Sequence, residues 1–461
     1  MTMVLPELDE VMSSERGFSL LIKGLPGTGK TILALSMITE FGGSDVLYVS
    51  TRLSPNSLYK QFPWLKECIL PLNVIDATKL YIAGDVHFGL QTFPEVLYSR
   101  LSKIEKPATV VVDSWDAMSS QVDDNKRVVS LQAAIAELVR ESRINLILVT
   151  ESMEVTPLDY LVDGIVVLRN YEINYRRARE IEIKKLRGIE IGQHKYIFTL
   201  KGGRFQSFKP FERRRIEKQR RAELALNTET HLSTGISDLD NIIGGGFERG
   251  SFNIIESGDD LSTLGYKSII AHMIINSIQQ GNNCVCIPCC GWDERRLRRG
   301  ILPFVSEEDY NKFFTIFEVG SEKKEDESEN VRILKGELMK ADFSKFREFI
   351  FSLEPPVMVI VGVDMLEYPY QLKERGKLGE MVGLLSHLMT DMRDVGNVGT
   401  FGMTSGLELS SELIHMSSTH LRLTELHKSV ILHCNRPETK LHCLENVVSD
   451  DTLRIKLTAI V

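Results

Sequence analysis

The sequence of 461 residues has no long apolar run and no surplus of positive charge. A membrane-spanning helix needs about 20 consecutive apolar residues, so we expect no membrane partner. The acidic N-terminus has neither the basic start nor the apolar stretch of a signal peptide, and we expect a cytoplasmic protein. The net charge of −8 opposes bulk binding of nucleic acid but permits a local basic patch.

Cysteine is also scarce, and the odd number of seven predicts reduced thiols rather than a disulfide framework. A cluster at positions 284, 286, 289 and 290 has the residue type of a zinc site, which requires four ligands in tetrahedral geometry. However, Cys284 and Cys286 lie in an apolar stretch, where free cysteine behaves as a small apolar residue. We therefore expect these cysteines to pack in a core.

Apolar stretches of strand length alternate with segments of helical periodicity over most of the chain. The stretches at residues 109–113 and 145–150 are apolar almost throughout, which is typical of parallel strands buried on both faces. The same order of segments begins again near residue 231. Because the chain is also too long for one ordinary core, we predict an α/β protein of two tandem domains. Each domain is expected to be a mainly parallel sheet covered by helices.

Residues 24–31 fit the phosphate-binding pattern G-x-x-x-x-G-K-[ST]. An apolar stretch precedes them and a helical stretch follows, so backbone N–H groups and the start of a helix can converge on phosphates. Lys30 is expected to reach the β- and γ-phosphates, and the Thr31 hydroxyl to bind Mg²⁺. The predicted phosphate-binding residues are Gly24, Leu25, Pro26, Gly27, Thr28, Gly29, Lys30 and Thr31.

A carboxylate follows in the expected place. Asp113 ends the apolar stretch at residues 109–113, and a carboxylate beside a phosphate loop holds the Mg²⁺ shell through water. We therefore predict Thr31 and Asp113 as the Mg²⁺ residues and Lys30 and Asp113 as catalytic residues. The sequence offers no readable element that selects the base of the nucleotide.

Together these motifs resemble the RecA superfamily, in particular the KaiC-like proteins of archaea and bacteria. The resemblance covers nearly the whole chain and implies ATP with Mg²⁺, a regulatory role and a homo-oligomer, with a hexameric ring as the family expectation. It rests on the phosphate loop, residues 48–50 with Ser54-Pro55, residues 110–114, Thr150-Glu151, residues 161–168, residues 184–188, and residues 233–236 with Leu239-Asp240 and 244–246. Residues 58–65 further resemble the branch of the gas-vesicle regulator GvpD.

The resemblance also assigns a role to two cations. Lys185 and Arg187 lie in the family's Lys-Leu-Arg-Gly element, where such residues reach the nucleotide of the neighbouring subunit as a trans finger. They are two positions apart on an expected strand and so point the same way. The alternative is a pair of exposed strand cations.

One departure from the family concerns the catalytic base. The family places Glu residues immediately before the Ser-Pro, whereas this sequence has Arg52 and Leu53. An arginine cannot accept a proton from the attacking water. Asp116 and Glu151 are the candidates to replace the missing carboxylate. We predict ATP binding with slow or switch-like hydrolysis, confined to the N-terminal domain.

The second half departs further at the position of a phosphate loop. In residues 256–268 the two glycines are seven positions apart rather than five, and Tyr266 separates Gly265 from Lys267. Asp259 and Asp260 place negative charge where phosphate would bind. We interpret this half as a degenerate copy with an interface or regulatory role. A functional variant loop is the alternative.

The expected organisation is an N-terminal lead-in (residues 1–16), an ATP-binding domain (17–210), a basic linker (211–230) and the degenerate domain (231–461). We interpret the linker, with Arg213, Arg214 and Arg215, as a solvated connector. A DNA-associated transcriptional regulator of GvpD type would instead use these arginines for salt-dependent DNA binding. A recombination or motor ATPase, recognisable by DNA-stimulated turnover, is the third alternative. The protein partner is not named by the sequence.

Overall fold

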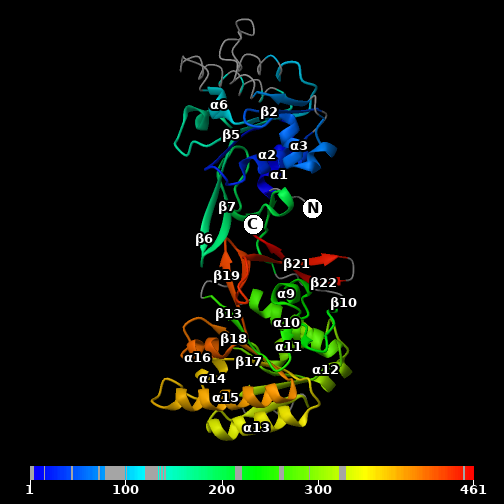
Figure 1. The fold of residues 1–461 in the computed structure, drawn as a ribbon, viewed down its shortest axis with the longest axis vertical. Coiled ribbons are helices and arrows are strands. Elements are labelled where there is room, and N and C mark those ends of the chain that lie inside the picture. Colours follow the sequence, from blue (N-terminus) through cyan, green and yellow to red (C-terminus); the bar gives the residue numbers. More distant parts are fainter. Residues whose placement is uncertain are drawn as a thin grey trace. The chain divides into compact units, whose positions relative to one another are not determined.

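Two units make up the chain in the computed structural model: Met1–Lys209 with Ile460–Val461, and Pro210–Ala459 (Figure 1). The structure describes all residues except 1–4, 15, 43–44, 71–72, 78–98, 100, 120–132, 134, 136–138, 140–141, 213–220, 259–263, 290, 321–328 and 450–451. The predicted basic patch at Arg213, Arg214 and Arg215 lies outside the described residues, as do Asp259 and Asp260.

The first unit is built on a nine-stranded sheet with the order β3-β2-β4-β5-β1-β6-β7-β8-β9. Neighbours from β3 to β6 pair in parallel, and neighbours from β6 to β9 pair antiparallel. The strands are β1 (Ser19–Gly24), β2 (Asp45–Ser50), β3 (Val74–Asp76), β4 (Ala108–Asp113), β5 (Ile144–Thr150), β6 (Gly164–Ile173), β7 (Arg176–Leu186), β8 (Lys195–Thr199) and β9 (Gln206–Ser207).

Apolar cores lie on both faces of this sheet. Side chains of α1, α2 and α3 belong to one core, and those of α6 and α8 adjoin the other. Alternate residues of β4 belong to different cores, because successive side chains of a strand point to opposite faces. Val111 lies in the first core, and Val110 and Val112 lie in the second. The helices are α1 (Pro6–Met12), α2 (Lys30–Phe41), α3 (Pro55–Gln61), α6 (Trp115–Ser119) and α8 (Pro157–Leu161), with 3₁₀ turns η1 (Pro63–Glu67) and η3 (Lys201–Gly203).

The parallel strands of the first unit all end at one edge of the sheet. The phosphate loop follows β1, Arg52 follows β2, Asp113 ends β4, and Glu151 follows β5. In the register of the sheet, Asp113 lies between Ser50 of β2 and Val149 of β5. Ligands of open α/β sheets bind outside such carboxyl ends, so the topology brings these segments together.

The second unit is built on an eleven-stranded sheet with the order β10-β22-β21-β20-β19-β13-β18-β17-β14-β15-β16. The neighbours from β19 to β16 pair in parallel, and β19 to β22 pair antiparallel. The strands are β10 (Arg221–Ala222), β13 (Phe252–Ser257), β14 (Cys284–Ile287), β15 (Phe314–Val319), β16 (Val331–Leu334), β17 (Met358–Gly362), β18 (Val398–Thr404), β19 (Thr419–Leu426), β20 (Ser429–Arg436), β21 (His442–Ser449) and β22 (Thr452–Ala459).

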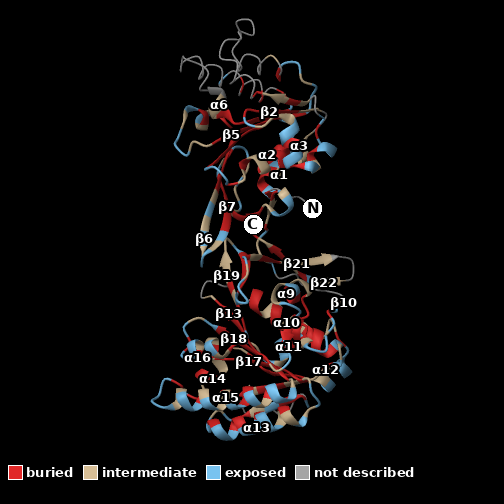
Figure 2. Ribbon diagram, in the orientation of Figure 1, coloured by how far each residue is buried: buried red, intermediate tan, exposed pale blue. Residues whose placement is uncertain are grey.

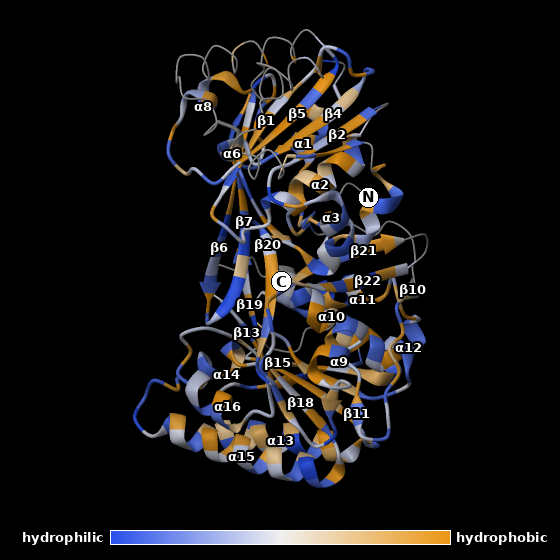
Figure 3. Ribbon diagram, turned by 45° about the horizontal axis from the view of Figure 1, so that its top comes forward, coloured by the Kyte–Doolittle hydropathy of each residue, from blue (hydrophilic) through white to orange (hydrophobic). Residues whose placement is uncertain are grey.

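Helices also cover the second sheet, and two large apolar clusters fill its faces. The helices are α9 (Ser237–Ile243), α10 (Leu264–Gln279), α11 (Glu294–Ile301), α12 (Glu307–Phe313), α13 (Met339–Ser352), α14 (Asp364–Glu367), α15 (Lys377–Val395) and α16 (Ser410–Met416), and a small ribbon joins β11 (His231–Leu232) to β12 (Phe247–Glu248). Buried residues concentrate on the strands of each unit (Figure 2), and the strands β1, β4 and β5 are largely hydrophobic (Figure 3).

The two units repeat one topology. In the first, β1 lies between β5 and β6, and in the second, β13 lies between β18 and β19, with a helix following the central strand in each. An antiparallel extension follows the parallel strands in both units. The predicted fold class, two tandem domains with mainly parallel sheets, is confirmed. Of the helices that the structure describes, none has both the length and the apolar character of a membrane span.

Two short segments have more structure than the sequence indicates. Within the expected lead-in, Leu5, which immediately precedes α1, and Leu8 of α1 are buried in a core of the first unit. Within the expected linker, β10 pairs with β22, and the Ala225 N–H donates to Asn276 Oδ1 at 3.1 Å. Such pairings join residues far apart in the chain, which local composition does not reveal.

Candidate functional site

The phosphate-loop motif connects β1 to α2, as the sequence predicts. Gly27 and Gly29 have φ angles of 79° and 103°, in the left-handed region that favours glycine. Gly29 is the N-cap of α2, and no side chain caps this helix start. The first N–H groups of a helix have no partner within the helix, so this turn offers backbone donors and a partial positive charge to an anion.

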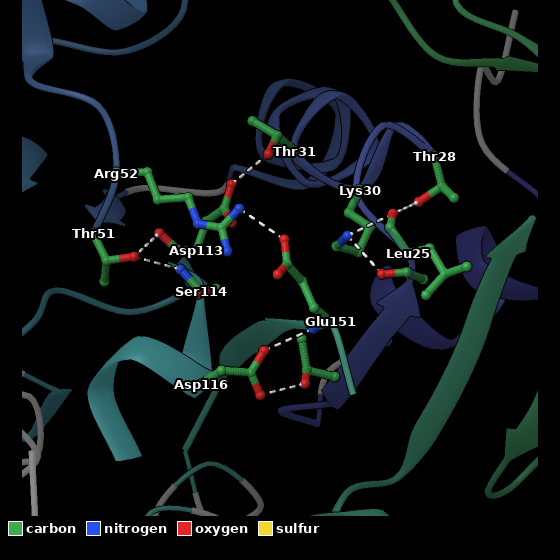
Figure 4. A network of polar contacts seen from close by, with 12 residues as sticks. Leu25, Thr28, Lys30, Thr31, Thr51, Arg52, Asp113, Ser114, Asp116 and Glu151 are labelled. Atoms are coloured by element: carbon green, nitrogen blue, oxygen red, sulfur yellow. Dashed lines mark hydrogen bonds and ion pairs between the residues drawn. The ribbon is translucent and has the colours of Figure 1, made fainter. Parts of the chain in front are cut away.

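A cavity of about 280 Å³ lies at this turn. Its walls come from the phosphate loop, the segment after β2, the end of β4 and the residue after β5. Among the described residues, four charged ones line it, namely Lys30, Arg52, Asp113 and Glu151. Figure 4 shows these side chains around a common centre, although Lys30 and Glu151 are 121 residues apart in the chain (151 − 30).

The Lys30 ammonium is held within the loop. It donates to the carbonyl oxygens of Gly24 at 2.6 Å and Leu25 at 3.0 Å, and the residue is only 7% exposed. Burial lowers the pKa of Lys30, and the carboxylates of Glu151 and Asp113 oppose that change. The loop thus positions one cation where the predicted phosphates would lie.

Asp113 joins three elements of the site. Its Oδ2 accepts hydrogen bonds from the Thr31 hydroxyl at 2.6 Å and from the Tyr48 hydroxyl at 2.9 Å. Tyr48, on β2, is 1% exposed. Burial raises the pKa of its phenol well above the usual value, and the Asp113 carboxylate acts in the same direction. The predicted Mg²⁺ residues Thr31 and Asp113 are therefore in direct contact.

Tyr48 has a part in the site that sequence reasoning missed. In the sequence, Tyr48 was identified only as one residue of an expected strand that resembles the family. The available signal was chemical, because a buried tyrosine hydroxyl usually finds a hydrogen-bond partner. The pairing of β2 with β4 supplies that partner, since Tyr48 lies opposite Val111, two residues before Asp113.

Arg52 and Glu151 form an ion pair across the cavity, with 2.7 Å between Arg52 Nη1 and Glu151 Oε1 (Figure 4). The hydrogen bond from Arg52 lowers the pKa of Glu151. Asp116, the other candidate to replace the catalytic carboxylate, does not line the cavity among the described residues. It accepts instead from the Thr150 hydroxyl at 2.6 Å and from the Glu151 N–H at 2.7 Å. Asp116 thus supports Glu151.

These residues fit Mg²⁺ with a phosphorylated nucleotide. The Thr31 hydroxyl and the Asp113 carboxylate are hard oxygen ligands, of the kind Mg²⁺ takes, directly or through water. The loop N–H groups and the Lys30 ammonium would hold the phosphates. Bound Mg²⁺ would supply neutralisation of phosphate charge.

The proposed trans finger is placed elsewhere. Lys185 Nζ donates to the carbonyl oxygens of Asp159 and Val162, both at 2.7 Å. Arg187 donates to the Tyr160 carbonyl at 3.0 Å and lies 3.3 Å from Asp163 Oδ1. Neither is among the described residues that line the cavity. Both lie against α8 and the residues that follow it, and their role towards a neighbouring subunit stays a prediction.

The corresponding turn of the second unit has different chemistry. Tyr266 is buried with its hydroxyl against Gly402 and receives a hydrogen bond from Cys289 Sγ at 3.1 Å. Buried residues follow it three and four positions later, as they follow Lys30 in α2. In the pattern of buried positions along the two helices, Tyr266, rather than Lys267, therefore corresponds to Lys30.

The remaining parts of that turn also differ. Lys267 lies over the Trp292 ring, with 5.6 Å from Nζ to the ring centroid. Asp113 is the last residue of β4, whereas β17 of the second unit ends at Gly362. The acidic residue that follows β17, Asp364, is the first residue of α14. Cys284 and Cys286 are buried in β14. No group of three or more His, Cys, Asp or Glu side chains able to hold a metal ion occurs among the residues that the structure describes.

Comparison with known proteins gives relatives for much of the chain. The family "GvpD gas vesicle protein, P-loop domain" matches residues 8–187. Protein GvpD1 of Halobacterium salinarum is 30% identical over 328 residues, which are 68% of this chain and 61% of the relative. Protein GvpD2 of the same organism is 30% identical over 305 residues, 61% of this chain and 60% of the relative.

A further relative is the circadian clock oscillator protein KaiC of Thermostichus vulcanus. It is 26% identical over 291 residues, which are 59% of this chain and 53% of that protein. The chain thus spans about three fifths of the length of the GvpD relatives and about half of the KaiC relative.

The contact between Tyr48 and Asp113 predicts a measurable contribution to stability. We expect Tyr48→Phe to lower the free energy of unfolding by about 1.5–3 kcal/mol, because it removes a hydrogen bond to a buried carboxylate. Tyr59→Phe is the matched control, since the Tyr59 hydroxyl donates to the neutral carbonyl of Ile69 at 2.8 Å, and about 0.5–1.5 kcal/mol is expected. Urea unfolding followed by circular dichroism checks both. Equal losses would contradict a special role of Tyr48.

Proposed function

The chain belongs to the RecA superfamily of P-loop proteins and is of the KaiC- and GvpD-like type, and from this premise we propose that it is an ATP-binding regulator. Its first unit would hold one MgATP and hydrolyse it slowly, so that the nucleotide acts as a switch. The observation that carries this proposal is the convergence of Lys30, Thr31 and Asp113 on one cavity at an uncapped helix start.

Slow hydrolysis follows from the carboxylates of the cavity. Asp113 is engaged by Thr31 and Tyr48, and Glu151 is engaged by Arg52. A general base must be within reach of water and must accept its proton. Arg52 occupies the position where the family has a carboxylate, and its hydrogen bond keeps the pKa of Glu151 low. Both conditions oppose rapid turnover.

The second unit would bind no nucleotide and would serve regulation or assembly. A buried tyrosine stands in the register of the phosphate-loop lysine, and no carboxylate ends β17. Assembly into a homo-oligomer is the further proposal, because a finger at Lys185 and Arg187 acts only across a subunit boundary. A protein partner of unknown identity would bind differently to the states with and without the bound triphosphate. The alternatives that use DNA gain no support from the described residues.

The stoichiometry of binding tests the proposal. We expect isothermal titration to give one MgATP per chain, and Lys30→Ala to weaken binding about 100-fold or more, equivalent to about 2.7 kcal/mol. Lys267→Ala is the matched control, because Lys267 lies near the start of α10, the helix that follows the central strand of the second unit, and its loss should leave affinity and stoichiometry unchanged. Two molecules of ATP per chain, or a loss of binding in Lys267→Ala, would overturn the single-site proposal.

The rate of hydrolysis gives a second test. Enzymes commonly turn over about 1–1000 times per second, and we expect this protein to remain well below about one per second. Leu53 lines the cavity beside Arg52, so Leu53→Glu places a carboxylate there and should raise the rate at least about tenfold. Turnover of tens per second in the wild type, unchanged by Arg52→Ala, would contradict slow hydrolysis.

Light scattering tests assembly. If a neighbouring subunit contributes to the site, the molar mass in solution should be at least twice the 52.2 kDa of one chain, and MgATP should stabilise the larger species. Replacing Lys185 and Arg187 together by alanine should weaken that response to MgATP. A monomer under all nucleotide conditions would remove the basis for a trans finger.

A further inference from the structure

We propose that Arg52 is the residue with which this site distinguishes a nucleoside triphosphate from a diphosphate, by exchanging the Glu151 carboxylate for the terminal phosphate. The assignment rests on the proposed function, since it requires that the cavity hold a nucleotide. By this assignment, Arg52, which stands where the family has a carboxylate, binds the terminal phosphate. Four features of the site support the assignment.

The first observation is that Arg52 has an anchored backbone and a movable head. On its N-terminal side, the Thr51 N–H donates to the Asp113 carbonyl at 2.8 Å, and the Ser114 N–H donates to the Thr51 hydroxyl at 2.9 Å. On its C-terminal side, the Leu53 N–H donates to Ser50 Oγ at 3.0 Å. The Arg52 side chain itself is 57% exposed. Its base is therefore fixed to the end of β4 while the guanidinium can turn within the cavity.

Glu151 likewise has an anchored backbone and a side chain that projects into the cavity. Its N–H is held by Asp116, and the Ser152 N–H donates to Thr150 Oγ1 at 3.1 Å. The carboxylate projects into the cavity, where Arg52 is its ion-pair partner at 2.7 Å. The pair thus connects two anchored segments, one after β2 and one after β5, across the space that the phosphate loop faces (Figure 4).

The third observation concerns charge. The charged residues that line the cavity are two cations, Lys30 and Arg52, and two carboxylates, Asp113 and Glu151. While the ion pair is closed, the Arg52 guanidinium is bound to Glu151, and its charge attracts a phosphate only weakly. Opening the pair frees a second cation in the cavity besides Lys30. A triphosphate, which carries one more phosphate than a diphosphate, gains more from that cation.

The fourth observation is that the exchange is energetically accessible. Ion pairs with exposed side chains contribute little to stability, and both partners here are partly exposed. A guanidinium binds phosphate through two parallel hydrogen bonds, which are stronger and more directional than contacts of a lysine. Only a ligand that interacts differently with the two states can shift them. A terminal phosphate within reach of Arg52 meets that condition, and a diphosphate leaves the pair closed.

The consequence is a local switch that hydrolysis would reset. With a triphosphate, Arg52 leaves Glu151, and the segments after β2 and β5 lose their connection through this pair. With a diphosphate, the pair reforms. The state of the nucleotide is thereby passed to residues 151–156 and to α8, against which Lys185 and Arg187 lie.

The test compares affinities for MgADP and for a non-hydrolysable MgATP analogue by isothermal titration on the full chain. Arg52→Ala should weaken the triphosphate analogue about tenfold or more while changing the affinity for ADP less than about twofold. Arg52→Lys should recover only part of this loss, because an ammonium cannot make the paired hydrogen bonds. Glu151→Gln should tighten the triphosphate a few-fold and leave ADP unchanged, since it removes the competing carboxylate.

Arg16→Ala is the matched control, because Arg16 is exposed and precedes β1 at the strand end away from the loop; it should change neither affinity. An unchanged affinity for ADP also reports that each variant is folded. Equal weakening of both nucleotides in Arg52→Ala, or no weakening of either, would overturn the role of Arg52 while leaving the nucleotide site in place. A wild-type chain that binds neither nucleotide would overturn the site together with this assignment.

Discussion

The hydrogen bonds that Asp113 accepts from Thr31 and Tyr48 are the contacts on which the rest of the site depends. They join the end of β4 to the start of α2 and to the neighbouring strand β2. Because a buried carboxylate without partners is costly, this arrangement holds the phosphate loop, the predicted Mg²⁺ residues and the segment that carries Arg52 in one place. A sheet with parallel strands makes it feasible, since the strand ends meet at one edge.

The second unit keeps the sheet and changes the chemistry. Its central strand, following helix and neighbouring strands repeat the first unit, yet Tyr266 packs against Gly402 where the first unit has an ammonium. Strand pairing and apolar cores require only a pattern of buried residues, whereas a phosphate site requires specific groups at specific atoms. The second unit can therefore share the strand order and the apolar cores of the first while the residues at the turn differ.

The sequence predicted the parts of the site that are local in the chain. The phosphate loop is a continuous motif with a backbone requirement of its own, and Asp113 is recognisable at the end of an apolar stretch. Arg52 was recognised as a departure, but not its bond to Glu151. The two are 99 residues apart (151 − 52), and only the order of strands β2, β4 and β5 in the sheet brings them to one cavity.

Periodicity and contiguous motifs act over a few residues, so the sequence alone was enough to predict the two α/β units, the phosphate-loop motif and the absence of the family's carboxylate at Arg52. The tertiary structure decided which carboxylate Arg52 meets, that Tyr48 supports Asp113, and that Tyr266 takes the register of Lys30. These outcomes depend on strand order, strand register and helix burial. Such properties are set by packing between distant segments, and no local pattern encodes them.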